Sequence, residues 1–144
     1  MILVLRTGDE AVLDRVAPDV FDNAIDPRAA AAYLADPRHH IAVAVEDGQV
    51  VGFASGVHYF HPDKPSPELF INEVGVSPGY RSRGIGKAVL AALLDEGRAL
   101  GCSGAWVLTD SDNSVAKRLY TTSGGHGSEG AEVMFDFDFE EPGR

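Results

Sequence analysis

Apolar residues recur along the chain with two different periods, and the period changes where glycine, proline or aspartate intervenes. Alternating or β-branched apolar runs predict strands, because successive side chains of a strand point to opposite faces. These runs cover residues 2–6, 41–46, 50–59, 70–76, 105–109 and 132–139. Apolar residues three or four positions apart predict helices over 9–16, 27–35 and 85–100, and a short one with Val115, Ala116 and Leu119 inside.

The residues between these runs favour an α/β fold. Asp47-Gly48 separates two apolar runs and is the strongest hairpin signal in the chain. Asp26 before Pro27 resembles a helix N-cap followed by proline at the first helical position. Gly101 follows the longest helical pattern, where a left-handed residue commonly ends a helix. We predict a mainly antiparallel sheet of about six strands with helices on both faces, in one domain spanning residues 1–144.

Composition narrows the classes of partner. The formal net charge of −10 argues against binding to nucleic acid or to an anionic membrane, and favours cationic ligands. No apolar run reaches the ~18 residues of a membrane span, and no charged-then-apolar leader precedes Ile2, so the cytoplasm is the expected location. A single cysteine, Cys102, excludes an internal disulfide.

The strand at 70–76 leads through a glycine-rich turn into the longest predicted helix, an arrangement that aims free N–H groups at a phosphate. Gly84 and Gly86 let the backbone approach a pyrophosphate, and Arg81 and Arg83 can add charge-assisted hydrogen bonds.

Two common phosphate motifs do not fit this turn. A Walker loop needs lysine where Ile85 stands, and a dinucleotide fingerprint needs a third glycine where Val89 stands. An ordinary connection with solvent-exposed arginines is the remaining structural alternative.

Val76 to Gly86 follows the pattern V-x-P-x-x-R-x-x-G-x-G, which resembles the acetyl-coenzyme A signature of the GNAT superfamily of N-acetyltransferases. Asn113 to Gly124 resembles the second GNAT signature, N-x-x-A-x-x-L-Y-x-x-x-G. The resemblance implies a GNAT-like, six- to seven-stranded mixed sheet and acetyl-CoA as cosubstrate. It also implies cofactor-binding roles for Val74, Val76, Arg81, Arg83, Gly84, Ile85, Gly86 and Asn113.

In this family the tyrosine of the second signature points at the coenzyme sulfur, so the resemblance implies that Tyr120 protonates the leaving thiolate. The pKa of a tyrosine, ~10, lies above that of a thiol, ~8.5, which suits this role. Packing in the core is the alternative for Tyr120. The resemblance further implies that Asn113 hydrogen-bonds the pantetheine arm or caps its helix.

Glu73 lies within the apolar run before the glycine-rich turn. A carboxylate there is costly unless it is used or paired. It can act as the base that takes a proton from an ammonium acceptor, or it can be an outward-facing or ion-paired strand residue. The sequence is compatible with both roles for Glu73.

Residues 71–77 and 132–138 resemble aminoglycoside 3-N-acetyltransferases, which carry an aspartate at the position of Glu73. Glutamate is one methylene longer, and residues 123–130 replace a compact turn common in the family. We expect direct acetyl transfer to a primary amine of a cationic small molecule, with an aminoglycoside (3-N position) first.

Other interpretations stay open. The acceptor can be a polyamine, an amino acid, or a peptide or protein amine, and the chain can be a non-catalytic coenzyme-binding module. A monomer and a homodimer are both compatible with the sequence. His39-His40 and His58-x-x-His61 lack the cysteine pair or H-E-x-x-H that would indicate a metal, so no metal site is predicted. No G-x-S-x-G elbow indicates a serine nucleophile.

Overall fold

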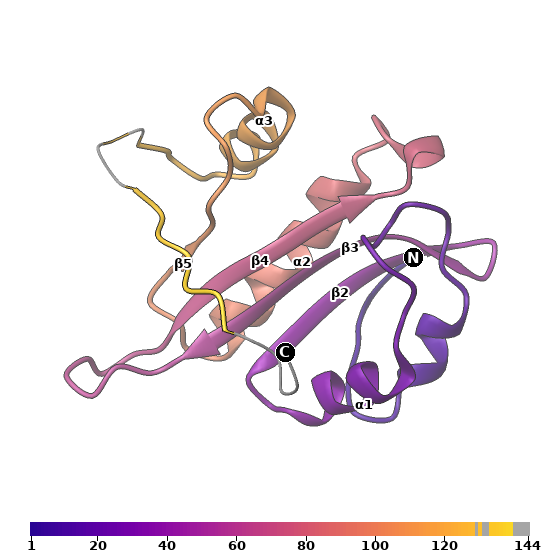
Figure 1. Ribbon diagram of the computed structural model, residues 1–144, viewed down its shortest axis with the longest axis horizontal. Coiled ribbons are helices and arrows are strands. Elements are labelled where there is room, and N and C mark those ends of the chain that lie inside the picture. Colours follow the sequence, from indigo (N-terminus) through magenta and orange to yellow (C-terminus); the bar gives the residue numbers. More distant parts are fainter. Residues whose placement is uncertain (129, 131–132, 140–144) are drawn as a thin grey trace.

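The computed structural model describes residues 1–128, 130 and 133–139, which contain a single mixed sheet in the order β1-β2-β3-β4-β5 (Figure 1). The pairs from β1 to β4 are antiparallel, and β4 and β5 are parallel. The strands are β1 (Ile2–Val4), β2 (His39–Glu46), β3 (Gln49–Tyr59), β4 (Glu68–Val76) and β5 (Ala105–Trp106). The helices of the described part are α1 (Pro27–Ala35), α2 (Ile85–Ala99) and α3 (Ser114–Thr122), with 3₁₀ turns at Glu10–Asp14 and Pro78–Tyr80.

Several local predictions are confirmed. Asp47 and Gly48 have φ of 52° and 75°, the left-handed values that a tight hairpin turn between β2 and β3 requires. The Asp26 carboxylate accepts hydrogen bonds from the backbone N–H groups of Arg28 and Ala29 at the start of α1, where Pro27 is the first residue. Gly101 has a φ of 81° just after α2.

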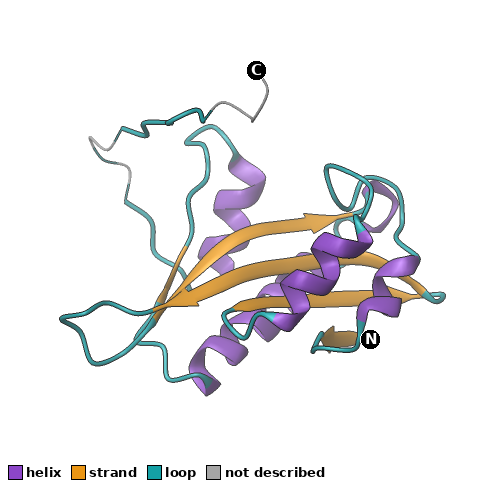
Figure 2. Cartoon of the chain, turned by 60° about the horizontal axis from the view of Figure 1, so that its bottom comes forward, coloured by secondary structure: helices purple, strands orange, loops and turns teal. Residues whose placement is uncertain are grey.

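The main core lies between α2 and the sheet. Helices cover both faces of the sheet, with α1 and α2 on opposite sides (Figures 1 and 2). Val89, Leu90 and Leu93 of α2 are fully buried there, and Leu69 of β4, also fully buried, lies against Gly97 of the same helix. Gly52 of β3 provides room for the helix, because a Cβ there would lie 2.8 Å from Cγ2 of Ile85.

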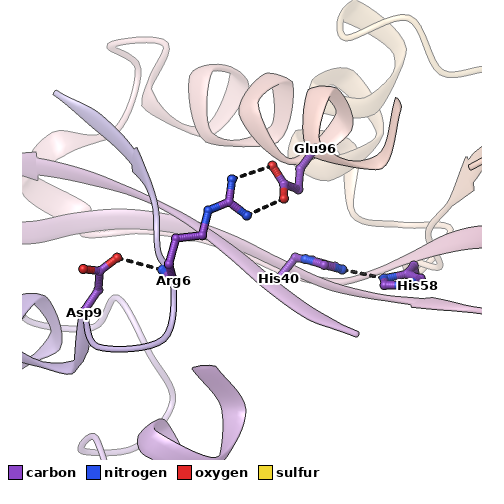
Figure 3. A network of polar contacts seen from close by, with 5 residues as sticks. All are labelled: Arg6, Asp9, His40, His58 and Glu96. Carbon is purple, nitrogen blue, oxygen red and sulfur yellow. Dashed lines mark hydrogen bonds and ion pairs between the residues drawn. The ribbon is translucent and has the colours of Figure 1, made fainter. Parts of the chain in front are cut away.

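Two polar contacts bridge the elements around this core (Figure 3). Arg6, after β1, donates two hydrogen bonds to the Glu96 carboxylate of α2, at 2.5 and 3.1 Å. Nε2 of His40 lies 2.7 Å from Nδ1 of His58, and both rings are buried. Burial, and next the charge of His58, lower the pKa of His40 below its usual value.

The sheet of the described residues has five strands, so the expectation of six to seven was wrong. The predicted strand at 132–139 accounts for the difference. Its first residue lies outside the described part, and residues 133–139 belong to no strand. Their alternation gives a strand two distinct faces, but a strand also needs a neighbour to hydrogen-bond with, and this segment has none within the described chain.

Three further expectations were inaccurate. The strand predicted at 105–109 is limited to Ala105–Trp106, because only these two residues pair with β4. Both are exposed, since no strand covers their other side in the described chain. The helix predicted at 9–16 is only a 3₁₀ turn, Glu10–Asp14. Val115 is 80% exposed rather than inside. Separately, none of the helices in the described residues is both long and apolar enough to cross a membrane.

Candidate active site

The glycine-rich turn ends at the N-terminus of α2. Gly84 is the N-cap, with φ of 79°, and no side chain caps this helix end. The first N–H groups of an α-helix have no acceptor within the helix, so those of Ile85 and Gly86 point outward at its positive end. The space beside Gly84 is open, since a Cβ there would meet no atom within 4 Å. The turn therefore offers an accessible set of donors to an anion.

Both arginines of the turn are exposed. Nε of Arg81 donates to the carbonyl oxygen of Val76 at 3.3 Å, which holds this side chain against the end of β4. The Arg83 guanidinium lies over the Tyr80 ring, 5.1 Å from its centroid, and 3.7 Å from the Glu46 carboxylate. Exposed ion pairs of this kind are weak, so Arg83 can exchange its partner for a stronger anion.

β4 separates from β5 before it reaches the turn. The two strands pair only at Leu69↔Ala105 and Phe70↔Trp106. Val74 and Val76, farther along β4, pair with β3 on one side but have no strand partner on the β5 side among the described residues. This free strand edge leads directly to the N-terminus of α2.

The second motif lies on α3. The side-chain oxygen of Asn113 accepts a hydrogen bond from the Ala116 N–H at 3.0 Å, which is the capping alternative considered for this residue. Tyr120 is half-buried, and burial raises the pKa of its hydroxyl. The helix is followed by Gly124 with φ of 98°, a conformation that favours the glycine of the motif.

The two motifs touch. A Cβ on Gly86 of α2 would lie 3.6 Å from Cγ2 of Val76 and 3.8 Å from Cδ2 of Leu119, the residue before Tyr120. The end of β4, the start of α2 and the inner side of α3 therefore meet at Gly86. Residues that are about 30 positions apart in the sequence therefore border the same site.

A β-bulge sets the direction of Glu73. Ser55 is opposite Glu73 and Gly56 is opposite Ile71, so Asn72 has no partner in the register. Regular alternation would turn Glu73 to the same face as Ile71, which is buried in the core. The extra residue turns Glu73 to the other face, where its side chain is exposed.

The residues that share this face with Glu73 could not be recognised from the sequence. Burial raises the pKa of Tyr33 to about 12, and the charge of Glu73 contributes to the rise. Tyr33 comes from α1, and its hydroxyl donates to the His40 carbonyl oxygen at 2.6 Å. Neither the bulge at Asn72 nor the approach of α1 has a signature in the sequence, because both depend on the packing of distant segments.

The histidines have other surroundings. His39 packs edge-on against the Tyr33 ring, and His61 pairs with the Glu68 carboxylate at 2.5 Å. Within the described residues, no three His, Cys, Asp or Glu side chains are arranged to hold a metal ion.

The comparison with known families agrees with this arrangement. Residues 10–124 match the Acetyltransferase (GNAT) family, and this range includes both motifs. The chain belongs to the GNAT family. The resemblance carried by Val76–Gly86 and Asn113–Gly124 is thereby confirmed.

Relatives among characterised GNAT proteins differ in their acceptors. The chain is 33% identical over 118 residues to L-2,4-diaminobutyric acid acetyltransferase of Nocardia farcinica, covering 80% of this chain and 58% of that protein. It is 29% identical over 103 residues to aminoglycoside N(6′)-acetyltransferase type 1 of Salmonella typhimurium, covering 65% and 71%. The chain thus spans less than two thirds of the first of these relatives.

A solved GNAT structure shares the fold. The aminoglycoside acetyltransferase AAC(6′)-Iy, in complex with the bisubstrate analogue CoA-S-monomethyl-acetylneamine, superposes with a TM-score of 0.76 at 21% identity, covering 96% of this chain and 97% of the other. The aminoglycoside relatives named here are of the 6′ type, so the comparisons do not support the 3-N position in particular.

Proposed function

We propose that this chain transfers the acetyl group of acetyl-CoA directly to a primary amine of a cationic small molecule. The observation that carries the proposal is the meeting of both GNAT motifs at Gly86, beside the free edge of β4. An enzyme that joins two substrates gains rate by holding them in reactive geometry, and this arrangement provides adjoining surfaces for both.

The coenzyme would bind along the end of β4 and the start of α2. The N–H groups of Gly84, Ile85 and Gly86 would bind the pyrophosphate, and Arg81 and Arg83 would add charge-assisted hydrogen bonds. The pantetheine arm would extend along the β4 edge and pair with the backbone of Val74 and Val76, as an added strand does. The capping bond of Asn113 supports an indirect role, in which this residue fixes the start of α3.

Two side chains would move the protons of the reaction. Glu73 would take a proton from the ammonium group, and the freed amine nitrogen would attack the carbonyl carbon of the thioester. As the carbon–sulfur bond breaks, Tyr120 would give its proton to the departing thiolate. The Tyr120 hydroxyl, whose pKa is raised by burial, is protonated at neutral pH and so has a proton to give. The new amide nitrogen would give its second proton to the Tyr120 phenolate, and Glu73 would lose its proton to water, which restores both groups.

The acceptor we favour is an aminoglycoside. The net charge of −10 and the exposed Glu73 carboxylate favour a polycation, and the aminoglycoside acetyltransferase among the relatives supports this class. The resemblance of residues 71–77 to aminoglycoside 3-N-acetyltransferases favours acetylation of the 3-N amine. The aminoglycoside acetyltransferase among the relatives is instead named as a 6′ type. A diamino acid is the second candidate, because the diaminobutyric acid enzyme is the relative with the higher identity of the two.

An acceptor panel tests this function. The purified chain and acetyl-CoA are incubated with gentamicin-type aminoglycosides, diaminobutyric acid, spermidine, lysine and peptide amines, and free coenzyme A is quantified over time. We expect the fastest release with an aminoglycoside, and NMR of the product identifies the acetylated nitrogen. Faster turnover of a diamino acid would make a diamino acid, rather than an aminoglycoside, the acceptor. Binding of acetyl-CoA without turnover of any amine would favour a coenzyme-binding module.

A further inference from the structure

Ser55 of β3 is a buried polar side chain beside the proposed base. It is 7% exposed and lies opposite Glu73 in the register between β3 and β4. Side chains of directly opposed residues point to the same face of a sheet, and their Cβ atoms are about 4.5–5.5 Å apart. The Ser55 hydroxyl is therefore within reach of the Glu73 carboxyl group.

The contacts of two nearby glycines show which face this is. A Cβ on Gly75 would lie 2.8 Å from the ring of Phe53, and these two residues are each two positions from Glu73 and Ser55 along their strands. A Cβ on Gly56 would instead lie 3.5 Å from a leucine side chain of α2. Because side chains alternate along a strand, Ser55 and Glu73 lie on the face turned away from α2, the side of the sheet where α1 packs (Figure 2).

Hydrogen bonds of fixed direction lead from Ser55 to the backbone. The Tyr33 hydroxyl of α1 donates its single proton to the His40 carbonyl oxygen at 2.6 Å, and a carbonyl oxygen can only accept. Burial raises the pKa of Tyr33 to about 12, so this proton stays in place at neutral pH. Ser55 is hydrogen-bonded to the same hydroxyl, in which Tyr33 can act only as the acceptor. With its own proton used in this way, Ser55 has only lone pairs to offer to Glu73.

We propose that Ser55 and Tyr33 are positioning residues for the base, an inference that rests on the proposed role of Glu73. When an N–H bond of the ammonium group breaks and the proton joins Glu73, the new carboxyl O–H donates to Oγ of Ser55. An ionised carboxylate has no proton to donate and gains nothing from this partner. The bond therefore stabilises the protonated form alone, which makes Glu73 a stronger base. No proton passes along the chain of hydroxyls, because Ser55 and Tyr33 keep theirs.

The elements packed on this face also carry ionisable groups that form the surroundings of Glu73. By register, contact or position in the segment that crosses the face, they are Tyr33, His39, Tyr59, Glu68, Asp19 and Asp22. Replacing Ser55 removes a hydroxyl and leaves every one of these groups in place. A change in the titration of Glu73 in such a variant therefore reports on the hydrogen bond rather than on a lost charge.

Carbon-13 NMR of the glutamate carboxyl groups follows the protonation of Glu73 directly, and the spectrum of Glu73→Gln identifies its signal. Ser55→Ala removes the accepting oxygen, so the titration midpoint of Glu73 should fall by about 0.5–1 pH unit. Tyr33→Phe should lower it at least as far, because the freed Ser55 proton can then be donated to the ionised carboxylate. Ser77→Ala is the matched control. It also removes a buried hydroxyl, which donates to the Pro18 carbonyl oxygen at 2.7 Å, and the midpoint should stay unchanged.

The pH profile of kcat/KM, measured with the best acceptor of the panel, connects this bond to the reaction. Its acidic limb reports the essential base of the free enzyme, so in Ser55→Ala and Tyr33→Phe it should move to lower pH together with the NMR midpoint. An unchanged or raised midpoint in Ser55→Ala, or a raised one in Tyr33→Phe, would overturn the inference.

Turnover of Glu73→Gln separates this inference from the proposed function. A large loss of turnover in Glu73→Gln, without a shift of the midpoint in Ser55→Ala, would leave the proposed function standing and overturn the hydrogen bond from Glu73 to Ser55. Shifted midpoints together with full turnover of Glu73→Gln would instead overturn the base role of Glu73, and the positioning role of Ser55 with it.

Discussion

Gly86 and Leu119 face each other where α2 meets α3, with 3.8 Å between Cδ2 of Leu119 and the position of a Cβ on Gly86. This is the distance of an ordinary van der Waals contact. The contact links two elements. One is the turn proposed to bind the coenzyme phosphates, and the other is α3, the helix that carries Tyr120. A shift of α3 would therefore move the proposed acid relative to the coenzyme.

Replacing Tyr120 by phenylalanine tests the proposed acid. Tyr120→Phe should lower kcat by about 10²–10⁴-fold, the usual effect of losing one proton donor. The KM for acetyl-CoA should stay near its wild-type value because the ring and its packing remain. Tyr80→Phe is the control, since this residue also flanks the site but has no proposed proton role. Unchanged turnover in Tyr120→Phe would make Tyr120 a packing residue.

The pH dependence of the activity tests the role of Glu73, the carboxylate on β4. Glu73→Gln should reduce kcat/KM most at lower pH, where the acceptor amine is most fully protonated and most needs a base. Glu68→Gln makes the same chemical change on the same strand, and we expect it to keep the wild-type profile. An equal loss at all pH values in Glu73→Gln would indicate acceptor binding rather than proton transfer.

Gly52 should be intolerant of a larger residue. A Cβ at this position would lie 2.8 Å from Cγ2 of Ile85 and 3.2 Å from the Gly75 carbonyl oxygen. Gly52→Ala should therefore lower the free energy of unfolding by about 1–3 kcal/mol, measured by urea denaturation. Gly104→Ala is the control, because a Cβ there meets no atom within 4 Å and we expect a change within about 0.5 kcal/mol. Equal stabilities of the two variants would contradict this packing.

The buried histidine pair predicts acid sensitivity. Because the pKa of His40 is lowered in the folded chain, the unfolded chain binds the proton more readily. Stability is then complete above the usual histidine pKa of about 6.5 and declines as the pH falls through it toward the lowered value. The groups around the ring include His58 and Arg6, which oppose protonation, and Glu96, which favours it.

The loss of stability can be measured as a fall in melting temperature between pH 7.5 and 5. This interval extends about one unit or more on either side of the usual histidine pKa. The wild-type chain should lose stability in that interval, and His40→Gln should lose less. His126→Gln, in the exposed stretch after α3, should behave as the wild type does. Identical profiles for all three would rule out His40 as the cause.

The sequence predicted the parts of the fold that depend on local chemistry. The hairpin at Asp47-Gly48, the cap at Asp26 and the turn before α2 each follow from backbone preferences of a few adjacent residues. Both GNAT motifs were recognisable because each lies within one short stretch, and their family is confirmed.

The remaining features depend on distant partners. The bulge at Asn72 is visible only in the register between β3 and β4, and it decides which way Glu73 points. The apolar alternation of residues 133–139 predicted a strand, but alternation cannot tell whether another strand lies beside it, and the segment belongs to no strand. Val115 was expected inside for the same reason, because helical spacing does not specify which neighbour covers the face.

Binding of acetyl-CoA to the N-terminus of α2 is the central claim, and calorimetric titration of three folded proteins tests it most directly. Gly84→Asp places a carboxylate at this helix end, and Gly101→Asp places one after the other end. Both glycines have left-handed φ values, 79° and 81°, and open space around them, so the two changes are closely matched. We predict affinity at least about tenfold weaker for Gly84→Asp and near wild type for Gly101→Asp. Equal affinities for all three proteins would contradict the account.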